Sequence, residues 1–251
     1  MLPQEHLIAR VVDLCRTDDR LDAALQYGSF PQGSGDQHSD IEFWLFTTAQ
    51  IDPVQWCAQI APITHHVRNE FGADVVFFAG LVRGEFHFAQ DVAQVSDWPA
   101  RGAPVDRMIV LDRTGALRAA LTEVPLHPTL PTAAEVCGRF ANWLVLAHHV
   151  RARGEALRTA DTMSHVQRHL LWMTRLAENT TTHWLTPSRL AERELPPQAP
   201  VATPEAAWHT GRALWLALDC PVPDALFAEL DAALGAHGDE RAVQHQPRHP
   251  S

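Results

Sequence analysis

Two acidic residues on a short apolar segment give the strongest chemical signal in the sequence. Asp40 and Glu42 flank Ile41 at the start of the run Asp-Ile-Glu-Phe-Trp-Leu-Phe-Thr, which is typical of a buried strand. Because side chains at positions i and i+2 of a strand point the same way, we expect both carboxylates on one face. Two adjacent carboxylates repel each other unless a cation is present. Mg²⁺ is the natural cation, since it prefers oxygen ligands that substrate phosphates can complete.

A glycine-serine pair lies shortly before these carboxylates. Gly28 and Ser29 follow an apolar run from Leu21 to Tyr27 and open a loop rich in turn-forming residues. Glycine lets the backbone turn and approach a phosphate closely. Backbone N–H groups and the serine hydroxyl can then hold phosphate oxygens. The pattern predicts a phosphate-binding turn at Gly28 and Ser29.

A third carboxylate is expected on a neighbouring strand. The segment 83–88 alternates, so that Arg83, Glu85 and His87 share one face and Phe86 and Phe88 the other. A polar face of this kind is typical of a wall facing an anionic substrate. Glu85 could accept a proton from an acceptor hydroxyl or ligate metal, whereas His87 is expected to be a hydrogen-bonded structural histidine.

Asp74 competes with Glu85 for the role of third carboxylate. It shares a strand face with Val76 and Phe78, and its position beside Gly72 also fits an exposed strand end. A metal pair of His165 and His169 is disfavoured, because no third ligand accompanies the two histidines.

The elements around these residues change character along the chain. Three prolines between residues 124 and 131 mark a boundary. We predict an α+β fold, in which a mixed β-sheet with flanking helices occupies residues 1–126. An α-helical bundle follows at 127–235, and a disordered tail at 236–251. The expected strands are 21–27, 40–47, 63–67, 74–78, 83–88 and 107–111, and the longest expected helices are 3–16, a helix ending at Gly154, 155–179, 205–218 and 223–234.

Composition narrows the functional classes. The formal net charge is -10, and neither half of the chain has the basic stripe that a nucleic-acid partner requires. The chain has no lysine, which excludes a P-loop lysine. The four cysteines are far apart, so a zinc or redox site is disfavoured. We find no apolar run long enough to span a membrane and no signal peptide, and we expect a cytoplasmic protein.

Together these motifs resemble the nucleotidyltransferase superfamily of the DNA polymerase β type. More narrowly, the sequence is similar to the lincosamide nucleotidyltransferases of antibiotic resistance, and the similarity covers about residues 1–190. The segments that carry it are Tyr27-Gly-Ser-Phe, the stretch from Gly33 to Phe43, Asn69-Glu-Phe-Gly72, Leu81-Val-Arg-Gly-Glu-Phe-His-Phe88, Arg153-Gly-Glu155 and His169-Leu-Leu-Trp-Met173.

The resemblance implies that residues 1–126 form a catalytic domain with a nucleotidyltransferase-type sheet and that the helical bundle at 127–235 binds the acceptor. It also implies a reaction and a set of roles. ATP and Mg²⁺ would be the cosubstrates, and a lincosamide such as lincomycin or clindamycin the small-molecule antibiotic acceptor. Asp40 and Glu42 would hold the metal and Glu85 would be the general base. The triphosphate would contact the turn that begins at Gly28, through Ser29, and also Arg83, because Pro31 and Gln32 stand where some relatives have a basic residue. The oligomeric state stays open, with a homodimer among the options.

Two other functions stay open at this point. The same chemistry could serve an aminoglycoside or another hydroxylated small molecule. Alternatively, the chain could be a non-catalytic regulatory module that keeps the nucleotidyltransferase fold. Three converging carboxylates at Asp40, Glu42 and Glu85 argue against the second alternative, since a module without turnover does not need them.

Overall fold

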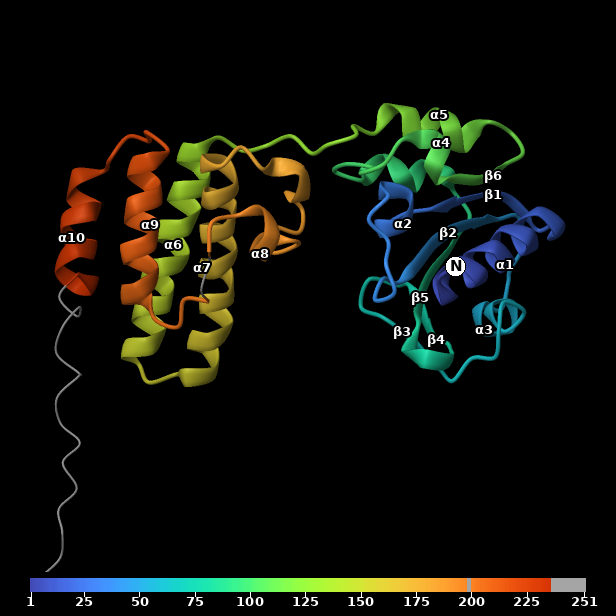
Figure 1. The fold of residues 1–251 in the computed structure, drawn as a ribbon, viewed down its shortest axis with the longest axis horizontal. Helices are drawn as coiled ribbons and strands as arrows, with labels where there is room; N and C mark the ends of the chain where they lie inside the picture. The colour runs from blue at the N-terminus through green and yellow to red at the C-terminus, as the bar shows by residue number, and fades with distance from the viewer. Residues whose placement is uncertain (198–199, 236–251) are drawn as a thin grey trace, which may run out of the picture. The chain divides into compact units, whose positions relative to one another are not determined.

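The computed structural model of the chain describes residues 1–197 and 200–235. These residues form two compact units, one spanning Met1–Thr129 and the other beginning at Leu130. The division falls within the proline-rich stretch 124–131. The tail expected at 236–251 lies outside the described residues (Figure 1).

The first unit is built on a six-stranded mixed sheet with the order β3-β4-β5-β2-β1-β6. Only β2 and β5 pair in parallel, and the other neighbours are antiparallel. The predicted α+β class is therefore confirmed. The strands are β1 (Leu21–Gln26), β2 (Ile41–Thr47), β3 (His65–Arg68), β4 (Asp74–Phe77), β5 (Arg83–Ala89) and β6 (Ile109–Asp112).

Helices cover both faces of this sheet. One core lies between the sheet and α1 and α3, and contains Ile41, Phe43 and Phe86. The other lies under α5 and a 3₁₀ turn at Val92–Asp97, and contains Leu25 and Phe46. Figure 1 shows α4 and α5 at the top of this unit, with α1 and α3 below β1. The helices are α1 (Pro3–Thr17), α2 (Ser29–Gln32), α3 (Pro53–Cys57), α4 (Val105–Met108) and α5 (Ala116–Glu123).

Two parts of the first unit differ from the sequence prediction. The strand expected from residue 107 begins at Ile109, because Pro104 opens the short helix α4, whose Met108 side chain is buried beneath α5. The loop expected after Gly28 forms the helical turn α2, which ends at Gly33 with a φ of 81°. An apolar run alone does not distinguish a short helix from a strand.

The second unit is helical. Its core contains Phe140, Leu144, Val166 and Trp208, and α6, α7 and α9 pack around it with α10 against α9. Figure 1 shows these four helices running alongside one another. The helices are α6 (Ala133–Ala152), α7 (Ala156–Ala177), α8 (Ala191–Glu194), α9 (Pro204–Ala217) and α10 (Asp224–Leu234).

A buried arginine holds the segment that follows α7. The side chain of Arg175 is 0% exposed. Its guanidinium donates to the carbonyl oxygens of Thr180 and Pro187, at 2.9 and 2.8 Å, and to that of Arg189 at 2.5 Å. It also donates to Glu194 in α8 at 3.1 Å. These contacts tie a segment of little regular structure to the helical core.

Within residues 1–197 and 200–235, no helix is both long and apolar enough to cross a membrane.

Candidate active site

A tight turn follows β1 and brings the start of α2 against β2. Gly28 has a φ of 77°, in the region that glycine adopts without steric cost. A β-carbon at Gly28 would lie 1.5 Å from Oε2 of Glu42, so only glycine leaves room for that carboxylate. The backbone N–H of Ser29 donates a hydrogen bond to Glu42. The predicted phosphate-binding turn is therefore in direct contact with one of the predicted metal ligands.

Three carboxylates gather on one face beside this turn. Asp40 immediately precedes β2, and Glu42 is the second residue of the strand. Glu85 on β5 is the direct partner of Glu42 in the parallel register, so their side chains project from the same face. Both Asp40 and Glu85 act electrostatically on Glu42. The pairing of β2 with β5 is what brings these residues together.

Arg83 bridges two of the three carboxylates. One guanidinium nitrogen contacts Oδ2 of Asp40, and the other lies 2.5 Å from Oε2 of Glu85. The Arg83 side chain is 32% exposed, so solvent reaches this pair of contacts. In this arrangement Arg83 is directed at the carboxylates, and a contact with a triphosphate would require it to leave them.

The negative charge of Glu42 is the least stabilised by its surroundings among the three carboxylates. Burial, and after it the charges of Asp40 and Glu85, raise its pKa to about 7. The Ser29 N–H and Arg83 act in the opposite direction but are outweighed. A nearby divalent cation would favour the ionised form, because it lowers the energy of the adjacent negative charge.

The donor set at this position fits a hard cation. Within residues 1–197 and 200–235, no group of three or more His, Cys, Asp or Glu side chains is arranged to hold a metal ion. Mg²⁺ is commonly held by one or two carboxylates together with substrate phosphates and water, however, and does not require a full protein cage. Asp40 and Glu42 are oxygen donors beside a phosphate-type turn and match that smaller requirement.

Glu85 is surrounded by donors. His87 Nε2 lies 3.5 Å from Oε1, and the hydroxyl of Tyr27 donates to the same oxygen at 2.9 Å. Hydrogen bonds from His87, Arg83 and Tyr27, the first being the largest effect, lower the pKa of Glu85 to about 2. Glu85 is therefore ionised at neutral pH. The expectation that Arg83, Glu85 and His87 share one face agrees with these contacts.

Asp74, the competing third carboxylate, lies elsewhere. It pairs with Phe86 across the sheet and so points to the opposite face from Glu85. It is not an exposed strand end, because it is 5% exposed and bonded to Nε2 of His66 at 2.9 Å. The alternation of β4 buries its carboxylate in a polar pair with His66.

Sequence reasoning did not single out Tyr27 as a functional residue. It lies just after β1, and its ring contacts His87 and Trp98 at centroid distances of 6.1 and 5.8 Å. Trp44 stacks on His87 at 4.6 Å. The one feature of the sequence that points to Tyr27 is its place immediately before the Gly28 turn. Its contact with Glu85 depends on strand pairing, which the sequence does not reveal.

The histidines of α7 have structural partners. His165 stacks on Trp143 with ring centroids 4.1 Å apart. His169 is buried and donates from Nδ1 to the carbonyl oxygen of His165 at 2.8 Å. These contacts hold both side chains in place on α7.

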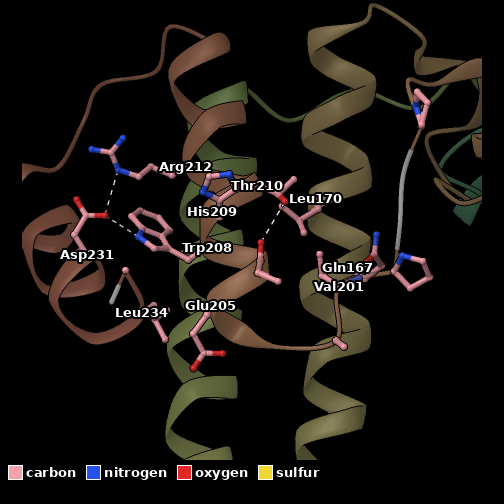
Figure 2. A pocket seen from close by; sticks show the side chains of 15 residues that line it. Gln167, Leu170, Val201, Glu205, Trp208, His209, Thr210, Arg212, Asp231 and Leu234 are labelled. Atoms are coloured by element: carbon pink, nitrogen blue, oxygen red, sulfur yellow. Dashed lines mark hydrogen bonds and ion pairs between the residues drawn. The ribbon is translucent and has the colours of Figure 1, made fainter. Parts of the chain in front are cut away.

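The helical unit contains a cavity of about 830 Å³. Figure 2 shows Trp208 and Asp231 on one side and Gln167 and Val201 on the other. The indole N–H of Trp208 donates to Asp231 at 2.8 Å, and Arg212 lies 3.2 Å from the same carboxylate. A volume of this size is in the range of small-molecule sites.

Comparison with known proteins identifies part of the helical unit. Residues 131–200 match the family described as "Lincosamide nucleotidyltransferase-like, C-terminal domain". This segment is similar to the C-terminal domain of the lincosamide nucleotidyltransferase-like family. The match confirms the family resemblance and covers α6, α7 and α8. Within the matched segment, α6 and α7 supply the greater part of the core of the helical unit, and α9 and α10 follow this segment in the chain.

Comparisons with solved structures and with curated proteins give less information than the family match. An aminoglycoside 6-adenyltransferase from Bacillus subtilis is similar at 12% identity and a TM-score of 0.35, over 95% of this chain and 100% of that chain. A similarity of this size carries no argument about activity. No curated protein matches the chain.

Proposed function

We propose that the protein transfers a nucleoside monophosphate from ATP to a hydroxyl of a lincosamide antibiotic in a Mg²⁺-dependent reaction. The observation that carries this proposal is the gathering of Asp40, Glu42 and Glu85 on one sheet face beside the Gly28 turn. The match of residues 131–200 to the lincosamide nucleotidyltransferase-like family supports the choice of acceptor.

The geometry around the turn supports the following proposal for the binding step. The triphosphate would rest against the backbone after Gly28 and the hydroxyl of Ser29. Asp40 and Glu42 would hold Mg²⁺, which when bound neutralises phosphate charge and aligns the α-phosphorus for attack. Arg83 would exchange its carboxylate contacts for the phosphates, and so supply a cation where the loop itself has Pro31 and Gln32.

The proton would be taken by Glu85. Its carboxylate is ionised, and release of Arg83 frees Oε2 to accept the proton of the acceptor hydroxyl. The acceptor oxygen attacks the α-phosphorus, and the bond from that phosphorus to the pyrophosphate oxygen breaks. Most of the acceleration would come from positioning and charge neutralisation, as is general in such transfers.

The reaction is tested by mass spectrometry of lincomycin and clindamycin after incubation with the purified protein, MgCl₂ and each nucleoside triphosphate in turn. A mass gain equal to one nucleoside monophosphate, largest with ATP, is the expected result. Asp40→Asn should abolish the gain. Asp97→Asn is a matched control, because Asp97 is exposed and lies in the same unit.

A panel of acceptors separates the alternatives. Pyrophosphate release with an aminoglycoside and none with lincosamides would keep the chemistry and reject the acceptor. Absence of both turnover and MgATP binding would reject the enzyme and favour a non-catalytic module.

A further inference from the structure

The two oxygens of the Glu85 carboxylate have different partners. Oε1 accepts the hydroxyl of Tyr27 at 2.9 Å and lies 3.5 Å from Nε2 of His87. Oε2 accepts from Arg83 alone among the hydrogen bonds found in the described residues. Oε1 therefore faces the rings of Tyr27 and His87. Oε2 faces the guanidinium group of Arg83, which also contacts Asp40.

Tyr27 is well placed to hold Oε1. A phenol has one O–H to donate, and Glu85 is its acceptor. Its ring contacts those of His87 and Trp98, which restrict its movement. Burial and the charges of Glu85 and Glu42 raise the pKa of Tyr27, so its hydroxyl remains a donor throughout the working pH range.

We propose that the hydroxyl of Tyr27 is a positioning group that fixes the Glu85 carboxylate with Oε2 directed at the acceptor hydroxyl. This inference rests on the proposed function. The terminal torsion of a glutamate is broad, so a carboxylate without such a contact presents either oxygen in a range of orientations. The bond from Tyr27 selects one orientation before substrate arrives.

The orientation of the Glu85 carboxylate matters because one particular oxygen, Oε2, takes the proton in the transfer step. The acceptor O–H bond breaks as its proton bonds to Oε2, and the acceptor oxygen bonds to the α-phosphorus. The bond from that phosphorus to the bridging oxygen breaks, and pyrophosphate leaves with the electron pair. Oε1 keeps its hydrogen bond from Tyr27 throughout. A rotated carboxylate would place Oε2 outside hydrogen-bond reach of the hydroxyl, and displacements of about 1 Å can lower a rate about 100-fold.

The test is the steady-state kinetics of Tyr27→Phe, which removes only the hydroxyl. We expect kcat to fall about 10- to 100-fold, with KM for ATP and for the acceptor unchanged. Trp98→Phe is the matched control, since it alters the ring that packs on Tyr27 and leaves the hydroxyl in place. Its kcat should fall far less than that of Tyr27→Phe, because the hydroxyl and its hydrogen bond to Glu85 remain, and thermal unfolding of both variants establishes that they are folded.

Three kinetic results would overturn the proposal. These are an unchanged kcat in Tyr27→Phe, a rise in KM without a change in kcat, and an equal loss of kcat in Trp98→Phe. The second result would make Tyr27 a binding residue, and the third would make the effect one of ring packing.

A spectroscopic measurement separates this inference from the proposed reaction. Tyr27 is the only tyrosine of the chain, so its ultraviolet resonance Raman bands report one phenol. The bands that respond to phenol hydrogen bonding should differ between the wild type and Glu85→Gln, which loses the charged acceptor. Identical bands would refute the contact. A wild type without turnover on any acceptor would refute the proposed function, whatever the Raman result.

Discussion

The carboxylate of Glu42 occupies the space that a β-carbon would take on Gly28. An ideal β-carbon there would lie 1.5 Å from Oε2 and 2.4 Å from Cδ of Glu42. The φ of Gly28 is 77°, which is also unfavourable for any residue with a side chain. The glycine of the motif therefore has two separate reasons to be glycine, and they can be distinguished experimentally.

Gly28→Ala should destroy transfer activity through the steric conflict with Glu42. Gly115→Ala is the matched control, because Gly115 has a φ of 78° and no atom within 4 Å of its ideal β-carbon. Both variants should lose about 1–2 kcal/mol of unfolding free energy from the positive φ, measured by urea denaturation. Only Gly28→Ala should lose activity, by about 100-fold or more. Equal activity in the two variants would show that Glu42 can move without consequence.

The carboxylate cluster was predictable in composition but not in geometry. Alternation was enough to place Glu85 with Arg83 and His87 and to predict β5 as a strand, and the apolar run after Asp40 was enough to predict β2. The parallel pairing that sets Glu42 opposite Glu85 has no signal in either segment. It arises from sheet topology, which depends on contacts distant in sequence, and Tyr27 was missed for the same reason.

The helical unit shows a different limit of sequence reasoning. Apolar periodicity predicted α6, α7, α9 and α10 within a few residues, because each buries one face. Arg175 was missed, since a charged residue on a helix is ordinarily exposed. It is buried because a segment of little regular structure offers carbonyl oxygens that need donors. This need for donors can be recognised only from the three-dimensional structure, in which the segment lies against α7.

Removal of either proposed metal ligand should weaken both the Mg²⁺-dependent binding of ATP and the turnover. For Asp40→Asn and Glu42→Gln we expect kcat to fall about 100-fold or more, because a neutral amide stabilises Mg²⁺ and phosphate charge poorly. Glu70→Gln is the control for the second variant, since Glu70 is exposed in the same unit. Isothermal titration with MgATP measures the binding. Wild-type Mg²⁺ dependence in Asp40→Asn would contradict the assignment of Asp40.

Arg175→Met should destabilise the helical unit. The substitution keeps the aliphatic bulk but removes the hydrogen bonds that Arg175 donates to three carbonyl oxygens and to Glu194. The expected loss is about 3 kcal/mol or more of unfolding free energy, because each unsatisfied buried acceptor costs about 1–3 kcal/mol.

Urea denaturation of the full chain, followed by far-ultraviolet circular dichroism, measures the loss in Arg175→Met. Arg168→Met is the control, since Arg168 is exposed on the same helix and should lose less than about 0.5 kcal/mol. Equal stability in the two variants would refute the structural role of Arg175.

The ionisation of Glu42 should contribute to the pH dependence of the unfolding free energy. Its folded-state pKa of about 7 lies above the ordinary value of 4.5, so the folded protein binds more protons than the unfolded chain between these values. Stability from this group is therefore fully present below pH 4.5 and is lost as pH rises through 7. Glu42→Gln lacks this titration, so the unfolding free energy of the wild type minus that of Glu42→Gln should fall between pH 5 and pH 8. Urea denaturation at each pH, without Mg²⁺, measures this difference. The subtraction cancels the contributions of groups that titrate alike in both proteins. A difference that does not change with pH would show that the pKa of Glu42 is not raised in the folded protein.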